Sequence, residues 1–212
     1  MRVLVMAKEP VPGRVKTRLC PPLDPAGAAE VAAAALHDTL DAVLASGAEE
    51  CVVALDGTPG PWLPRRAHVV AQRGGSFAER LENAWAHMRG PTLQIGMDTP
   101  QLTAAGVDEA LRLAEHGPAA LGPAEDGGWW ALAVREPRRG MFAGVPMSDA
   151  STGERQRRRL RALGLEPEPL PTLRDVDRWD DALAVAALAP QGRFAATVAR
   201  LAGAAVTRAA RA

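Results

Sequence analysis

The chain opens with Arg2-Val3-Leu4-Val5-Met6-Ala7 and continues directly into Lys8-Glu9-Pro10-Val11-Pro12-Gly13-Arg14-Val15-Lys16-Thr17-Arg18-Leu19. The first run is apolar and too short for an independent helix, which is typical of a buried strand. Two prolines and a glycine prevent regular structure in the second run and make it a stiff loop. Open α/β sheets bind ligands beside the carboxyl ends of their strands. These nineteen residues therefore predict an α/β sheet with a rigid loop at its ligand-binding edge.

The same loop carries four cations, Lys8, Arg14, Lys16 and Arg18, against the single carboxylate of Glu9. Four like charges repel one another, and an anion that bridges them relieves the repulsion. We interpret the loop as a clamp for a polyphosphate. The alternative is a solvated basic turn, which gives no reason for the paired prolines. The loop is not a Walker loop, because no Gly-Lys-Ser/Thr closes it.

Apolar strand-like runs alternate with helical patterns along the rest of the chain. We expect strands at 51–55, 68–71, 92–96, 119–122, 129–134 and 166–170, and helices at 25–46, 77–88, 103–115, 151–163, 178–188 and 193–209. Ser76 with Glu79, and Ser151 with Glu154, have the spacing of capping boxes. The alternation predicts an α/β fold with a mainly parallel sheet and helices on both faces. No linker divides the chain, so we expect residues 1–212 to form one domain, with helix 193–209 packed on it or on a second subunit.

Composition excludes several classes of protein. The chain is 47% hydrophobic and 24% charged with a formal net charge of zero, which argues against nucleic acid as the main partner. The opening apolar run is too short for a signal peptide, and no run is long enough to span a membrane. Cys20 and Cys51 have no metal-binding spacing. We expect a cytoplasmic protein without a membrane partner, as a monomer or a homodimer.

Carboxylates follow several of the predicted strands. Asp98 comes directly after strand 92–96 and before Pro100, which places it at the same sheet edge as the basic loop. A carboxylate among phosphates requires a hard cation between them, and Mg²⁺ prefers a few carboxylates with phosphate oxygens and waters. We therefore expect Asp98 to bind Mg²⁺, or Mn²⁺. The alternative is that Asp98 caps a turn or the next helix.

Two later acidic segments could join this site. Asp175 and Asp177 point to the same side if their segment is extended, and form a second candidate carboxylate pair. The alternative for Asp177 is an N-cap of the following helix. Asp126 lies in Glu125-Asp126-Gly127-Gly128, where it could orient an acceptor or bind the metal. Trp129 and Trp130 lie on opposite faces of the next strand, so we expect at most one of them to line a pocket.

Four motifs together resemble the DUF2064 family, which belongs with the nucleotide-diphosphosugar-transferase (GT-A) superfamily. They are Lys8-x-Pro-x-Pro-Gly-x-x-Lys16-Thr17-Arg18-Leu19, Ile95-Gly96-Met97-Asp98-Thr99-Pro100-x-Leu102, Gly122-Pro123-Ala124-Glu125-Asp126-Gly127-Gly128 and Asp175-Val176-Asp177. The first motif is also similar to that of 2-phospholactate guanylyltransferases. The resemblance implies a single Rossmann-like GT-A domain, a nucleotide bound over the first loop, and Mg²⁺ held by carboxylates.

The resemblance also implies roles for individual residues. Asp98 matches the metal ligand after the central strand, and Asp175 and Asp177 match the late acidic motif that completes the metal site. Lys16 and Arg18 match the cations that contact phosphate. The nucleotide would contact the end of the first strand and the loop, at Ala7, Lys8, Pro12 and Gly13, and its base or ribose would contact Gln72, Gly74 and Gly75.

These observations lead to a working hypothesis: a Mg²⁺-dependent nucleotidyltransferase that moves NMP from an NTP to a small phosphorylated acceptor and releases pyrophosphate. Lys16 and Arg18 would neutralise the charge that develops on the leaving group. The alternative is a GT-A glycosyltransferase that uses a nucleotide sugar, with Asp126 as the base for an acceptor hydroxyl. A third reading is a nucleotide-binding regulatory module.

Overall fold

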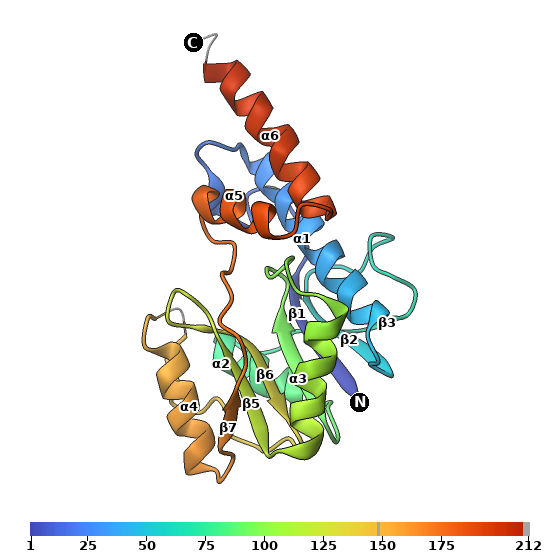
Figure 1. Cartoon of the computed structure of the whole chain (residues 1–212), viewed down its shortest axis with the longest axis vertical. Helices are drawn as coiled ribbons and strands as arrows, with labels where there is room; N and C mark the ends of the chain where they lie inside the picture. The colour runs from blue at the N-terminus through green and yellow to red at the C-terminus, as the bar shows by residue number, and fades with distance from the viewer. Residues whose placement is uncertain (148, 210–212) are drawn as a thin grey trace.

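A computed structural model describes residues 1–147 and 149–209, with side chains up to residue 204 (Figure 1). Its strands are β1 (Arg2–Lys8), β2 (Glu50–Asp56), β3 (Ala67–Ala71), β4 (Thr92–Gly96), β5 (Ala119–Pro123), β6 (Trp129–Val134) and β7 (Pro167–Pro169). Its helices are α1 (Pro25–Ala45), α2 (Phe77–Trp85), α3 (Ala104–His116), α4 (Thr152–Ala162), α5 (Trp179–Leu188) and α6 (Arg193–Ala209), with a 3₁₀ turn at Thr17–Leu19. No helix of this described part is long and apolar enough to cross a membrane.

Within the described chain, seven strands form one sheet in the order β3-β2-β1-β4-β6-β5-β7. All neighbouring pairs are parallel except those of β6, which runs antiparallel to β4 and β5. The predicted mainly parallel α/β sheet is therefore confirmed. The single reversal arises because the short turn 124–128 joins β5 to β6 as a hairpin, whereas parallel neighbours need a longer crossover.

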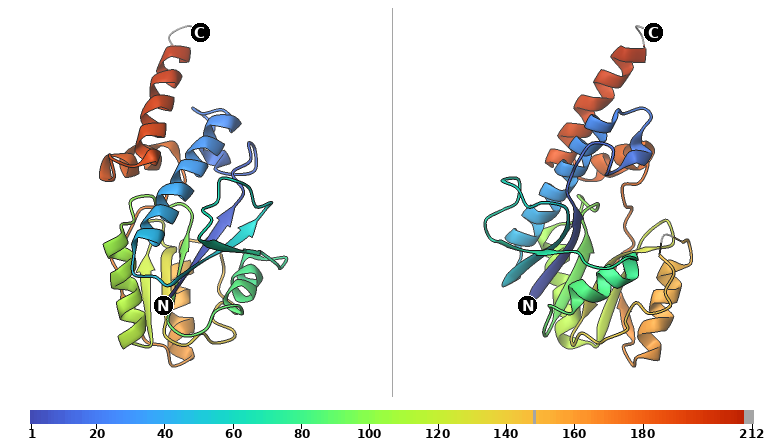
Figure 2. Two further views of the ribbon diagram at one scale, coloured as in Figure 1. Left: turned by 90° about the vertical axis from the view of Figure 1, so that its right-hand side faces the viewer. Right: turned by 180° about the vertical axis from the view of Figure 1, so that it is seen from behind.

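Helices cover both faces of the sheet, as the alternation predicts. Helices α1 and α3 lie on one face and α2 and α4 on the other, and each face has its own buried cluster (Figures 1 and 2). The central strands are apolar on both sides, since Val3, Leu4 and Val5 have no exposed surface. Strands buried on both faces read as continuous apolar runs, which explains the opening sequence.

Helix α6 packs on both α1 and α5 beyond the carboxyl ends of the central strands, and it extends away from the sheet (Figure 1). A third apolar cluster holds them, with Phe194 of α6 buried against residues of α1 and α5. This arrangement places the segment before α5, which carries Asp175 and Asp177, directly over the sheet edge.

Two local expectations are wrong. The capping box of Ser76 and Glu79 is present, but α2 ends at Trp85 rather than at residue 88. The reason is that the N–H groups of residues 87 and 88 bond to carbonyls three residues back, not four as in an α-helix. Ser151 does not cap α4 through its side chain. Its hydroxyl bonds instead to Asp149, which also accepts the Ser151 backbone N–H.

Candidate functional site: a charged cleft at the carboxyl edge of the sheet

The basic loop is held in an unusual conformation. Lys16 has φ 47° and ψ 35°, and among the described residues no other residue besides glycine has a positive φ. This left-handed region is costly for a residue with a side chain, and such strain clusters at functional sites. Leu19 anchors the loop because its side chain has no exposed surface. The strained turn at Lys16 directs its side chain into the sheet edge.

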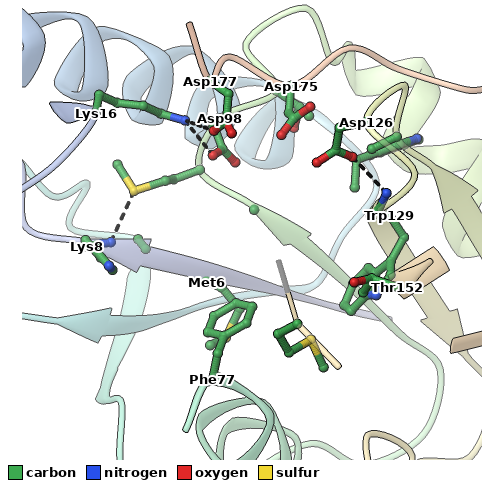
Figure 3. Close-up of a pocket in the computed structure, with 18 of the residues that line it drawn as sticks. Met6, Lys8, Lys16, Phe77, Asp98, Asp126, Trp129, Thr152, Asp175 and Asp177 are labelled. Carbon is green, nitrogen blue, oxygen red and sulfur yellow. Dashed lines mark hydrogen bonds and ion pairs between the residues drawn. The ribbon is translucent and has the colours of Figure 1, made fainter. Parts of the chain in front are cut away.

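The cations of the loop meet the carboxylates of distant segments. Lys16 Nζ lies 2.7 Å from Asp98 Oδ2 and 3.9 Å from Asp177 Oδ1, and it also donates to the carbonyl of Val176 (Figure 3). Arg18 Nη1 lies 2.7 Å from Asp177 Oδ2. The Lys16 side chain is only 10% exposed, so its charge is shielded from water. The structure therefore brings together the opposite charges that the sequence placed at one edge.

These carboxylates are not helix caps. Thr103 caps α3 by accepting the Gly106 N–H, and Asp181 accepts the backbone N–H of Arg178 at the start of α5. Asp98 and Asp177 instead bond to the loop cations. The alternative that Asp98 or Asp177 serves as a helix cap is therefore excluded.

The charged groups line a cleft of about 680 Å³. Among the residues expected at the site, the cleft is lined by Ala7, Lys8, Lys16, Arg18, Gln72, Asp98, Asp126, Asp175 and Asp177. Pro12, Gly13, Gly74 and Gly75 are not among its lining residues. Pro12 and Gly13 form the exposed tip of a turn closed by the Arg14 N–H and the Val11 carbonyl.

Gly74 and Gly75 serve the start of α2 rather than the cleft. Gly74 has φ 127°, and a Cβ on it would lie 2.7 Å from Cβ of Glu79. The Gly75 N–H donates to Glu79 Oε2. Their role in this structure is to let the chain pass close to the capping box.

Gln72 joins the strands beneath the loop. Its amide nitrogen donates to the carbonyls of Ala7 and Ala54, each at 2.9 Å. Carbonyls only accept, so these two bonds fix which end of the amide is the nitrogen. Gln72 lines the cleft, and its Oε1 is buried without a hydrogen-bond partner among the described residues.

The carboxylates of Asp98, Asp126, Asp175 and Asp177 in the cleft repel one another. Burial, together with the negative charges of Asp126, Asp98 and Asp177, raises the pKa of Asp175 to about 6. Within the described residues, no three His, Cys, Asp or Glu side chains converge as a ready metal cage. A donor set of one or two carboxylates fits Mg²⁺, which keeps several waters and takes its other ligands from phosphates.

Several residues that line the cleft, most of them apolar, were not predicted from the sequence. Met6, Phe77, Gln94, Met147 and Thr152 also line it. Figure 3 shows Met6 and Phe77 on the side opposite the carboxylates. Gln94 had a signal in the sequence, because a glutamine in a buried strand is unusual.

The expectation that at most one tryptophan faces the pocket is wrong. Trp129 and Trp130 belong to different core clusters, as opposite faces require, yet both line the cleft. The cleft crosses the end of β6, where the pairing with β5 shifts register at Pro123. Trp130 Nε1 donates to the Pro171 carbonyl at 2.9 Å, so its polar atom is already satisfied.

Comparison with known proteins gives a family and a fold. Residues 28–149 match DUF2064, described as "Uncharacterized protein conserved in bacteria". A search of curated proteins found no match. Among solved structures, a proposed nucleotide-diphospho-sugar transferase from Desulfovibrio desulfuricans is 24% identical with a TM-score of 0.86, over 98% of this chain and 96% of that one.

Two nucleotidyltransferases share the fold more distantly. One, from Methanothermobacter thermautotrophicus, has a TM-score of 0.57 at 16% identity, over 87% of this chain and 95% of that one. The other is a CMP:2-keto-3-deoxy-manno-octonic acid synthetase complexed with CTP, with a TM-score of 0.55 at 15% identity over 89% and 98%. The fold is thus that of nucleotidyltransferases and GT-A-like proteins, as the motifs suggest.

Proposed function

The chain belongs to the DUF2064 family, and from this premise we propose that it is a nucleotidyltransferase, which moves NMP from an NTP to a small-molecule acceptor and releases pyrophosphate. The observation that carries the proposal is the meeting of Lys16 and Arg18 with Asp98 and Asp177 in one cleft. Cations for phosphates and carboxylates for a divalent ion are both needed for this chemistry. The relatives of this fold include a nucleotidyltransferase and a synthetase bound to CTP, which adds support.

The triphosphate binds along the basic loop. Lys8 and Arg14 line the cleft, and their side chains have no hydrogen bond or ion pair within the described chain. These two cations are therefore available to a ligand without breaking any internal contact. The base or ribose lies toward Gln72, which lines the cleft.

Asp98, with Asp175 or Asp177, would hold Mg²⁺, and the ion would supply positive charge to the phosphate groups. Lys16 already neutralises part of the carboxylate charge, since its ammonium bonds to Asp98 and approaches Asp177. When a triphosphate binds, Lys16 and Arg18 turn their donors from these carboxylates to the phosphate oxygens.

The reaction needs little covalent participation from the protein. The acceptor's oxygen or nitrogen forms a bond to the α-phosphorus, the bond from this phosphorus to the bridging oxygen breaks, and pyrophosphate leaves with the electron pair. Lys16 and Arg18 stabilise the charge on the leaving group. Asp126, exposed at the rim of the cleft, accepts a proton where the acceptor carries one.

Glycosyl transfer from a nucleotide sugar is the second candidate. The observation that favours it is Asp126, an exposed carboxylate in the cleft that can deprotonate an acceptor hydroxyl. The relative from Desulfovibrio desulfuricans, a proposed nucleotide-diphospho-sugar transferase, agrees with this reading. Four cations in the loop suit a triphosphate better than a diphosphate, so nucleotidyl transfer remains the first proposal.

A panel of NTPs and nucleotide sugars, each with Mg²⁺, tests the two candidates. We expect an NTP to raise the melting temperature and to release pyrophosphate when a pool of small metabolites supplies the acceptor. If only nucleotide sugars stabilise the fold, and nucleoside diphosphate is released, glycosyl transfer is correct instead. Asp98→Asn separates both from a regulatory module, because an enzyme loses turnover while a metal-independent sensor retains nucleotide affinity.

A further inference from the structure

The two sides of the cleft differ in charge. The cations that line it, Lys8, Arg14, Lys16 and Arg18, all come from residues 8–18. A second part of the lining consists of Phe77, Trp129, Met147 and Thr152. None of the described lining residues close to these four in sequence is a cation. Figure 3 shows Lys8 and Lys16 on one side, with Trp129 and Thr152 on the opposite side. Phosphate groups are thus favoured on the first side alone.

The second side has an apolar surface that is open to a ligand. Phe77, the first residue of α2, is 42% exposed although it is a large aromatic side chain. Trp129 stacks on the buried Phe142 with ring centroids 6.1 Å apart and an interplanar angle of 18°, which holds its ring in place. Rigid aromatic rings and the adaptable thioether side chain of methionine bind rings and hydrocarbon groups well.

A single buried amide lies at the floor of this apolar side. Gln94 lines the cleft yet is only 3% exposed, and its Oε1 accepts from Trp85 Nε1 at 3.4 Å. Indole nitrogen only donates, so the amide oxygen faces Trp85 and the amide nitrogen faces away from it. No hydrogen bond from Gln94 Nε2 exists within the described part of the chain.

The backbone around Gln94 explains how a ligand reaches it. Gly96 follows two residues later on the same face of β4 and has no side chain to cover Gln94. The hydroxyl of Thr152 is already engaged, because it donates to the Pro146 carbonyl and accepts the Asp149 N–H. Gln94 Nε2 is therefore a donor left over for a ligand, and leaving it unpaired costs free energy.

We propose that this side is the acceptor subsite and that it takes a neutral alcohol or amine with a ring or hydrocarbon group. The group packs on Phe77, Trp129 and Met147, and an oxygen of the acceptor receives the Gln94 Nε2 hydrogen bond. This inference rests on the proposed function and refines it. The sequence suggested a phosphorylated acceptor, but the described lining has no second group of cations, apart from the basic loop, that would bind its phosphate. A neutral acceptor carries a proton at its attacking atom, which passes to Asp126.

The experiment uses matched pairs of probes, such as 2-phenylethanol with 2-phenylethyl phosphate, and cyclohexylmethanol with its phosphate ester. Binding of each probe to the full chain is measured by saturation-transfer NMR, with and without a saturating NTP and Mg²⁺. We expect at least one alcohol to bind more tightly than its phosphate ester. If every ester binds more tightly than its alcohol, or no alcohol binds, the proposal is overturned.

Two variants with matched controls locate the binding. Gln94→Leu should weaken the alcohol roughly fivefold by removing one hydrogen bond, whereas Gln156→Leu, at a buried glutamine outside the cleft lining, should not. Phe77→Ala should weaken binding of the alcohol about tenfold, and Leu183→Ala, which changes a side chain of nearly equal exposure (43%) on α5, should leave this binding unchanged.

If the two cleft variants weaken binding of the NTP instead of the alcohol, this side holds the nucleoside and the proposal is wrong. A protein that binds the alcohols but no nucleotide refutes the proposed function alone.

Discussion

Lys16 Nζ lies 2.7 Å from Asp98 Oδ2, so the loop after β1 and the segment after β4 are joined by an ion pair. The pair is mostly shielded from water on the lysine side, where the side chain is 10% exposed. The groups proposed to bind phosphate and metal therefore neutralise each other in this structure. If a metal–nucleotide complex binds as proposed, the Lys16–Asp98 ion pair would be replaced by contacts of Lys16 with phosphate and of Asp98 with the metal.

Lys16→Met should lower kcat/KM for the NTP by about 100- to 1000-fold, because a cation at the leaving group is lost. It should also lower the melting temperature without metal, since Asp98 and Asp177 lose their shared partner. Mg²⁺ should restore part of that stability. Steady-state pyrophosphate release and thermal unfolding with and without EDTA measure the two effects. A variant that keeps kcat/KM within threefold contradicts the assigned role.

Arg14→Gln should weaken NTP binding roughly tenfold and leave the melting temperature unchanged. The reason is that Arg14 lines the cleft but its side chain has no bond within the described residues, and charge-assisted bonds to phosphate are worth about 1.5–3 kcal/mol. Titration calorimetry measures the affinity. Arg66→Gln, at an exposed arginine outside the cleft lining, is the matched control and should bind NTP normally. Equal affinities in the two variants would place the phosphates elsewhere.

Gly96→Ala should reduce activity about tenfold with little change in stability, on the order of 1 kcal/mol or less. A Cβ on Gly96 would lie 2.7 Å from Asp98 Oδ1, so the carboxylate that bonds to Lys16 must shift. Gly203→Ala is the control, because a Cβ at that position on α6 would meet no atom of the described residues within 4 Å and alanine favours a helix. Unchanged metal dependence in Gly96→Ala would show that Asp98 does not bind the metal.

Much of the fold could be predicted because the hydrophobic pattern of each segment agrees with its position in the folded sheet. Strands buried on both faces appear as apolar runs, and their alternation with helices determines a mainly parallel sheet. The antiparallel β6 did not follow from hydrophobic pattern, because strand direction depends on the length of the 124–128 connection. The capping box expected at Ser151 is absent because Ser151 has φ −95° and ψ 0°, outside the extended conformation typical of an N-cap, and its hydroxyl donates to Asp149.

The charged half of the site was foreseeable for a simple reason. Residues that follow parallel strands meet at one edge, so Lys16 and Asp98 could be placed together from sequence alone. The apolar half was not, because Phe77 starts a helix and Met147 lies in a loop whose position depends on tertiary packing. Gly74 and Gly75 were assigned to the nucleotide, whereas in the structure they accommodate Glu79.

Asp175→Asn should make the metal-free protein more stable above pH 6, by about 1 kcal/mol. Burial and the charges of three neighbouring aspartates raise the pKa of Asp175 to about 6 from its ordinary value of 3.8. A carboxyl with a raised pKa in the folded state favours folding while it is protonated, and this stability is lost as pH rises from about 4 to about 6. Asparagine cannot ionise, so the variant should not show this loss. Chemical unfolding in EDTA at pH 4.5, 6 and 7.5 measures the difference, and Mg²⁺ should narrow it by stabilising the wild-type carboxylate. Parallel pH profiles for the two proteins would mean that Asp175 is not held among like charges.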